Sequence, residues 1–131
     1  MPPTRRTRYE QDLRQHFATQ GCGMVRSAGS KGSVDVIAHD ATVVRWIQVK
    51  STESWAADNK FPTRLADAVA ALLALCLPPE TNERWLYVHV HRQGWFTVRV
   101  DGWRAGRIEL LARVHGVLRA WQAGVRIVEG V

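Results

Sequence analysis

The sequence predicts an α/β protein of three layers, in which helices cover both faces of a central mixed β-sheet. Apolar residues at spacings of three and four predict an N-terminal helix. Runs rich in β-branched residues, bounded by Gly, Asp and Pro, predict strands. A mostly apolar stretch lies between the strands and predicts a helix that packs across a sheet face. The length of 131 residues suits one domain, residues 1–131, and the 46% of apolar residues can fill its core.

The predicted elements follow in the order αβββαββα, with a short last strand after them. The first helix spans residues 5–19, where Tyr9, Leu13 and Phe17 share a face. Strands are predicted at residues 22–27, 32–39 and 42–51, and an apolar helix at 64–77 ends before two prolines. Residues 84–92 and 95–103 form a hairpin around a Gln-Gly turn. A helix at 104–124 and a strand at 125–128 complete the chain.

The charge balance favours a polyanionic partner. Basic residues exceed acidic ones by 18 to 12, and fifteen of the basic residues are Arg, whose planar donors suit phosphate. Nucleic acid is the usual partner of such a chain, although a generally basic proteome would give the same excess. Several of these charges lie at the start of the first helix, where they oppose the helix dipole. We therefore predict DNA phosphate contacts for Arg5, Arg6, Arg8 and Lys31.

Other classes of protein are disfavoured. The two cysteines, Cys22 and Cys76, have no CxxC spacing, which argues against a disulfide scaffold and a zinc site. The N-terminal segment has no apolar stretch of the signal-peptide type. The longest apolar run is shorter than the roughly 20 residues that a membrane span needs. We expect a cytoplasmic protein with no membrane partner.

Charged and polar residues inside apolar strands indicate a site. Gln48 and Lys50 are two apart and project from the same face of their strand. An antiparallel pairing across the short turn before them brings Asp35 to about the level of Gln48. A further acid is available on the first helix, from Glu10 or Asp12. Buried charges are costly unless they are paired or bound to a metal, so this cluster is either a structural ion pair or a functional site.

The cluster has the chemistry that phosphodiester hydrolysis needs. A hard divalent cation prefers oxygen ligands, which Glu10, Asp35, Gln48 and the backbone carbonyl of Val49 can supply. Lys50 can orient or help deprotonate the attacking water. The loop at residues 27–33, "SAGSKGS", offers backbone amides that a phosphate can approach closely.

At these residues the sequence resembles a known family. The segments "VDVIA" and "IQVK" resemble the core of the PD-(D/E)XK nuclease superfamily. The wider run, with "RYE", "VRSAGSKGSVDVIA" and "IQVKS", looks most like the archaeal-type Holliday junction resolvases. The resemblance covers about residues 5–51. It implies a restriction-endonuclease-like fold, Mg²⁺- or Mn²⁺-dependent cleavage of four-way DNA junctions that leaves a 5′-phosphate, and a homodimer.

The resemblance also implies roles for individual residues. Glu10 and Asp35 would be metal ligands, Gln48 would stand at the second acid of the motif, and Lys50 would be its lysine. In the loop, Ser30 would match a serine that helps catalysis or holds DNA. Arg26, at the end of the first strand, would match a basic residue that binds DNA.

The sequence departs from the family pattern at two positions. Val34 replaces a proline that is often absent. Gln48 replaces an acid, which removes one negative charge from the metal site, and this QxK form resembles the Mrr-like restriction nucleases. Gln48 therefore keeps two alternatives open: an Mrr-like or repair endonuclease acting on duplex DNA, and a non-catalytic DNA-binding module with a degraded site.

Simpler interpretations of single residues also remain. Asp35 and Lys50 can form a buried ion pair, and Asp12 reads as a surface residue. His89 and His91 have metal-like spacing, but no third ligand accompanies them, so a half-exposed strand face explains them better. Trp55, just past the motif, is a weak candidate for contact with DNA or a partner subunit.

Overall fold

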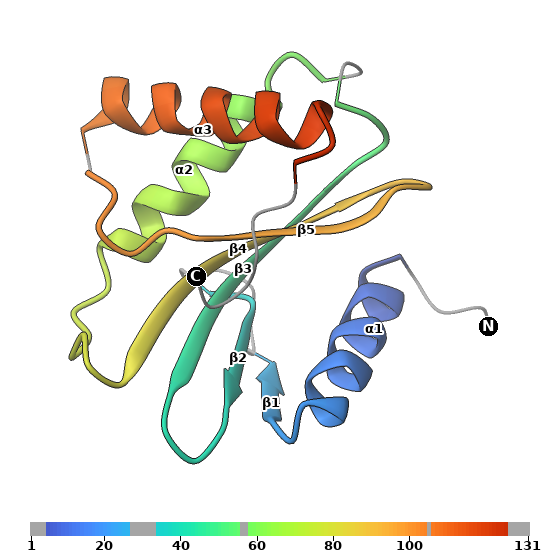
Figure 1. The fold of residues 1–131 in the computed structure, drawn as a ribbon, viewed down its shortest axis with the longest axis vertical. Coiled ribbons are helices and arrows are strands. Elements are labelled where there is room, and N and C mark those ends of the chain that lie inside the picture. Colours follow the sequence, from blue (N-terminus) through green and yellow to red (C-terminus); the bar gives the residue numbers. More distant parts are fainter. Residues whose placement is uncertain (1–4, 27–33, 56–57, 105, 126–131) are drawn as a thin grey trace.

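The computed structural model describes residues 5–26, 34–55, 58–104 and 106–125 (Figure 1). Within them the strands form one five-stranded sheet in the order β1-β2-β3-β4-β5. β3 and β4 are parallel and the other neighbours are antiparallel, which makes the predicted mixed sheet. The elements are α1 (Arg5–Thr19), β1 (Gly23–Arg26), β2 (Val36–His39), β3 (Val44–Thr52), α2 (Phe61–Leu73), β4 (Asn82–Val90), β5 (Gly94–Arg99) and α3 (Arg107–Gln122).

The predicted three layers are confirmed. α1 lies on one face of the sheet, and α2 and α3 lie on the other (Figure 1). Each face has its own core of buried side chains. The α1-side core contains Leu13, Phe17, Val36, Ala38, Ile47, Trp85 and Tyr87. The larger α2-side core contains apolar residues of α2, β4, β5 and α3.

The apolar helix α2 begins and ends a few residues earlier than the sequence predicts. It begins at Phe61, with Pro62 in its first turn, where the missing N–H of proline costs nothing. It ends at Leu73, four residues before the expected end. At this end, the guanidinium of Arg84 on β4 donates hydrogen bonds to the carbonyls of Leu72 and Leu75. These bonds satisfy carbonyls for which the end of a helix leaves no further helical partner.

The predicted hairpin and its alternation are confirmed. Phe96, Val98 and Val100 are buried in the α2-side core, while the residues between them face the other way. The hairpin turn contains Arg92 with a φ of 66°. Trp55 packs against Phe96, with ring centroids 5.0 Å apart, and its indole N–H donates to Gln93. Trp55 therefore packs on the core beside the hairpin, and this packing explains a tryptophan at this position without a contact to DNA.

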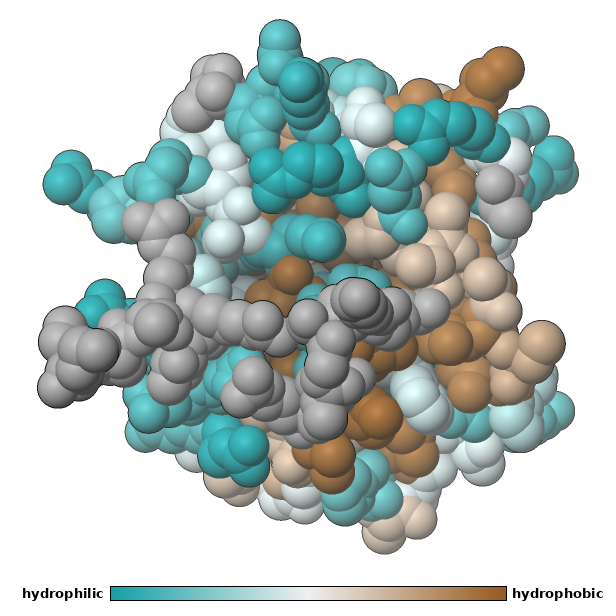
Figure 2. Space-filling view, turned by 180° about the vertical axis from the view of Figure 1, so that it is seen from behind, coloured by the Kyte–Doolittle hydropathy of each residue, from teal (hydrophilic) through white to brown (hydrophobic). Residues whose placement is uncertain are grey.

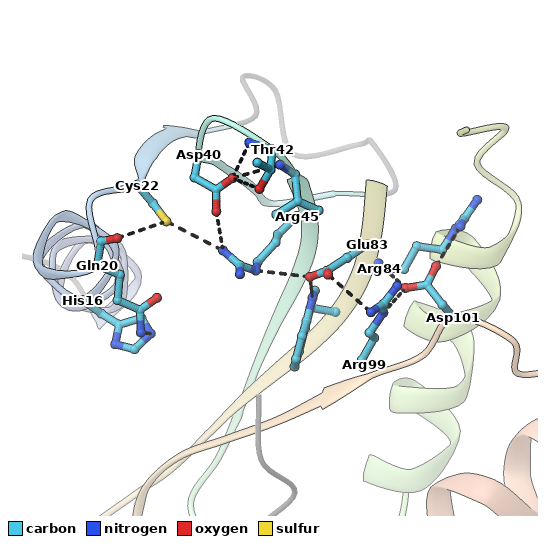
Figure 3. Close-up of polar contacts among 12 residues, drawn as sticks. His16, Gln20, Cys22, Asp40, Thr42, Arg45, Glu83, Arg84, Arg99 and Asp101 are labelled. Atoms are coloured by element: carbon cyan, nitrogen blue, oxygen red, sulfur yellow. Dashed lines mark hydrogen bonds and ion pairs between the residues drawn. The ribbon is translucent and has the colours of Figure 1, made fainter. Parts of the chain in front are cut away.

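An ion-pair network fixes one end of the sheet (Figure 3). It crosses β3, β4 and β5 and joins Asp40, Arg45, Glu83, Arg99, Asp101 and Arg84. Arg45 and Glu83 are register partners on the parallel strands, and their charged atoms are 3.2 Å apart. Lys50 lies five residues further along β3, about 16 Å away at the usual rise of a strand. The network therefore holds the strands together at the end opposite to the predicted site.

Asp101 is a carboxylate of this network that accepts hydrogen bonds from both Arg84 and Arg99. Partial burial alone would raise its pKa, but hydrogen bonds from the Arg84 backbone N–H and from the side chains of Arg99 and Arg84 outweigh that effect and lower it. The group therefore stays ionised and keeps β4 joined to the end of β5.

Two expectations concern other parts of the chain. The predicted strand at 125–128 falls almost wholly on residues outside the described ranges, and the one described residue, Val125, is in no strand. Among the described residues, every helix is too short or too polar to cross a bilayer.

Candidate active site

A pocket of about 340 Å³ opens between α1 and the ends of β2 and β3. Four of the residues predicted for the site line it: Glu10, Asp35, Val49 and Lys50. They come from α1, from the residue before β2, and from β3. The structure thus brings together side chains that are as much as 40 positions apart in the sequence. Glu10, Asp35 and Lys50 are all half-buried.

The tight turn between β2 and β3 sets the register of the site. One carboxylate oxygen of Asp40 accepts hydrogen bonds from the backbone N–H groups of Thr42 and Val43, at 2.7 and 2.9 Å. These bonds, the Thr42 backbone N–H first, lower the pKa of Asp40. The strands then pair with Val36 opposite Ile47. The next position puts Asp35 level with Gln48, as the sequence predicted.

Asp35 stands where the ladder between β2 and β3 stops. Its backbone N–H donates to the carbonyl of Ile47 at 2.9 Å. Its carboxylate accepts the N–H of Val49 at 2.9 Å, in place of a further backbone partner. In the described part of the chain β2 begins at Val36, and β3 runs on past its partner Ile47 to Thr52. Val49, Lys50 and Ser51 in this part of β3 line the pocket.

Lys50 and Gln48 have different surroundings. Alternation along β3 sends both side chains to the face opposite Ile47 and Val49, which contact the α1-side core. Lys50 lines the pocket, whereas the described lining residues do not include Gln48. Gln48 is only 7% exposed and shares its face with Trp46, which packs against the α2-side core. Gln48 is therefore a buried neighbour of the pocket residues Val49 and Lys50, on the face of β3 that packs against the α2-side core.

Glu10 is placed by the packing of α1. Tyr9, Leu13 and Phe17 lie at spacings of four and face the sheet, and the last two are fully buried. The Tyr9 ring lies over His89, with centroids 4.5 Å apart, and meets the edge of Trp95. This anchoring holds the first turns of α1 against β4 and β5. Glu10 follows Tyr9 and lines the pocket.

The predicted DNA-binding residues are only partly described. Arg8 is exposed on α1. Arg5 and Arg6 are in the first turn of α1 and Arg26 ends β1, but the side chains of all three fall outside the described part. Ser30 and Lys31 also lie outside the described residues. Their predicted roles stay predictions.

The structure argues against the ion-pair interpretation of Asp35 and Lys50. Both residues are described, and the ion pairs found among the described residues do not join them. Asp35 is instead held by the Val49 N–H. Asp35 and Lys50 thus line a shared pocket without forming an ion pair with each other.

The donor set fits a hard cation with few protein ligands. No group of three His, Cys, Asp or Glu residues is arranged for a metal anywhere in the described ranges, which also disfavours a site at His89 and His91. The pocket offers two carboxylates, Glu10 and Asp35, and the backbone of Val49. Magnesium is commonly held by one or two carboxylates, with water and substrate phosphate completing its shell. The residues therefore fit Mg²⁺ or Mn²⁺, with fewer charges than an acid at position 48 would give.

Sequence reasoning missed the apolar side of the pocket. Tyr9, Leu13 and Val36 line it, although their periodicity indicated only core packing. Ser51 also lines it, although alternation turns it away from Lys50. The sequence did hold one indication that Tyr9 lines the pocket, because Tyr9 directly precedes the predicted site residue Glu10.

Comparison with protein families gives one match. Residues 1–61 match the family model described as archaeal Holliday junction resolvase (Hjc). The N-terminal part of this chain is resolvase-like. The matched segment runs from α1 to the first residue of α2 and contains every residue predicted for the site. The resemblance noted from the sequence is therefore confirmed.

The fold of the resolvases is confirmed by a solved structure. Hjc from Archaeoglobus fulgidus, a Holliday junction resolvase from an archaeal hyperthermophile, matches with a TM-score of 0.53 and 22% sequence identity. The match covers 72% of this chain and 71% of the archaeal one. None of the curated proteins compared with the sequence gives a match. At this level of identity the likeness concerns the fold, and the match to the resolvase family model concerns the segment that carries the site.

Proposed function

We propose that this protein is a metal-dependent DNA endonuclease that resolves four-way junctions by hydrolysing phosphodiesters in opposed strands. One observation carries the proposal: Glu10, Asp35, Val49 and Lys50 line a single pocket on a resolvase fold. The match of residues 1–61 to the resolvase family supports the same substrate. The net charge of +6 suits a DNA partner.

Glu10 and Asp35, with the backbone carbonyl of Val49, would hold the cation. When bound, Mg²⁺ or Mn²⁺ would stabilise the charge that builds up on the phosphate, and it would lower the pKa of a coordinated water. Lys50 would orient the attacking water and stabilise the phosphate oxygens. Gln48, behind the pocket, would contribute an amide oxygen if its side chain turns toward the pocket. Arg5, Arg6, Arg8, Arg26, Ser30 and Lys31 would hold the DNA strands on either side.

A homodimer would suit a two-fold symmetric junction, because it provides one site for each of two strands. The face turned away from the viewer in Figure 1 carries apolar residues at its surface (Figure 2). Such a surface is suited to burial against a second copy. Most apolar residues of α2, by contrast, are buried within the chain. We infer a cytoplasmic location from the substrate.

The proposal is tested with end-labelled four-way junction, flap and linear duplex DNA, each incubated with the protein in Mg²⁺ or Mn²⁺. We expect paired, symmetric nicks in the junction and slow cleavage of the linear duplex. Chelation with EDTA should stop cleavage and leave binding, and binding should weaken steeply as salt rises.

The alternatives predict different results. Efficient cleavage of linear duplex would favour an Mrr-like or repair endonuclease, for which the Gln at position 48 is the supporting observation. Tight junction binding without cleavage in either metal would indicate a non-catalytic binding module.

A further inference from the structure

Apolar side chains line the pocket beside polar ones. The polar residues are Glu10, Asp35, Lys50 and Ser51, and the apolar ones are Tyr9, Leu13, Val36 and Val49. Leu13 and Val36 are only 2% and 1% exposed, whereas Tyr9 is half-buried. A cation and a phosphate bind polar groups, which leaves the Tyr9 ring for another part of the substrate.

The Tyr9 ring is held in place before any ligand arrives. His89 lies at a centroid distance of 4.5 Å with a tilt of 36°, and Trp95 meets the ring at 5.7 Å and 77°. His89 and Trp95 also touch each other, with centroids 5.0 Å apart. Tyr9 is half-buried by these contacts and still borders the pocket. A ring fixed in this way loses little freedom when a planar group stacks on it.

We propose that Tyr9, in the wall of the pocket, stacks on an unstacked nucleobase next to the scissile phosphate. This assignment rests on the proposed function, because it takes the phosphate to lie beside Lys50 and Asp35. Base and phosphate belong to one nucleotide, so a phosphate beside Lys50 keeps its base within a nucleotide's length of Tyr9, which lines the same pocket. Stacking on an aromatic side chain tolerates any base, since every base has a π-face.

The same contact discriminates between DNA structures. In linear duplex both faces of a base are covered, and unstacking costs a few kcal/mol. At a branch point the stack is interrupted, so the base reaches Tyr9 at a lower cost. Tyr9 would therefore select branched DNA over duplex, without reading its sequence.

The test removes the base from the DNA and the ring from the protein, separately and together. Abasic nucleotides are placed one at a time around the branch point of a four-way junction. Binding is measured at constant salt, in EDTA, for wild-type protein and for the Tyr9→Leu and Tyr9→Phe variants. We expect one abasic position to weaken wild-type binding about tenfold, in the range measured for base–aromatic stacking. Tyr9→Leu should weaken binding of the intact junction equally and be indifferent to that abasic position, whereas Tyr9→Phe should behave as wild type.

Other results overturn the proposal. If Tyr9→Leu weakens binding to intact and abasic junctions by the same factor, Tyr9 serves only to hold α1. If no abasic position weakens binding of the wild-type protein, no base enters the pocket; this arm decides the matter even if Tyr9→Leu fails to fold. Since binding is measured without metal, a failure of cleavage, which would overturn the proposed function, leaves this result readable.

Discussion

Asp35→Asn is expected to abolish cleavage of four-way junctions while leaving their binding intact. The amide has the shape of the carboxylate, and its oxygen can still accept the Val49 N–H that Asp35 accepts at 2.9 Å. The fold should therefore be retained. The variant loses the negative charge that holds a cation, and a bound metal supplies several kcal/mol of transition-state stabilisation. Because each 1.4 kcal/mol is tenfold in rate, single-turnover cleavage should fall by at least about 10³-fold.

Asp35→Asn also has an expected effect on junction binding. Removal of a carboxylate from a site that receives a phosphate reduces repulsion, so junction affinity in EDTA should stay equal or rise. The matched control is Asp12→Asn, which makes the same change of charge at an exposed position of α1. Asp12→Asn should cleave like the wild type. Near-normal cleavage by Asp35→Asn, or an equal loss in the two variants, would be incompatible with a catalytic role for Asp35.

Gln48→Glu should raise both metal affinity and cleavage. The glutamate has the same length and adds the negative charge that the resolvase pattern usually has at this position. Affinity for hard cations rises with the number of charged ligands, so we expect Mg²⁺ or Mn²⁺ to bind about tenfold more tightly. Gln48 is only 7% exposed, so the new charge should also destabilise the metal-free protein. Metal should therefore raise the melting temperature of Gln48→Glu more than that of the wild type.

Calorimetric titration with Mn²⁺ and the melting temperature in EDTA and in Mg²⁺ measure these effects. Gln48→Met is the matched variant, since it keeps the length of the side chain and removes the amide oxygen. If Gln48 ligates the cation, Gln48→Met should bind Mn²⁺ more weakly than the wild type. Unchanged Mn²⁺ affinity in both variants would assign Gln48 to the packing of the sheet alone.

The part of the site that the sequence predicted correctly depends on local geometry. The turn between β2 and β3 is short, and the Asp40 carboxylate fixes it, so the register follows from counting residues outward. This placed Asp35 level with Gln48. The buried face of α1 was also predictable, because Tyr9, Leu13 and Phe17 recur at a spacing of four. The position of Glu10 beside this face follows from that spacing.

The features that were missed depend on packing between distant segments. The carbonyls at the end of α2 are bonded by Arg84, which lies on β4 and has no sequence signal near the helix. The burial of Gln48 depends on the core behind β3, so spacing alone gave it the same environment as Lys50. The apolar side of the pocket is formed by α1 residues together with the end of β2. Residue types in the sequence indicated which polar groups belong to the site. The packing of α1 on the sheet determines which apolar residues line the pocket with them.

The central claim is that Glu10, Asp35 and Lys50 form one metal-dependent centre. It is tested most directly by the position of Mn²⁺ in the anomalous difference map of a crystal of the wild-type protein. The predicted result is a peak in the pocket within about 2.5 Å of a carboxylate oxygen of both Glu10 and Asp35, consistent with bonds to oxygen ligands. A pocket without a peak at saturating Mn²⁺, or a peak that leaves Asp35 bonded to Val49 alone, would contradict the claim.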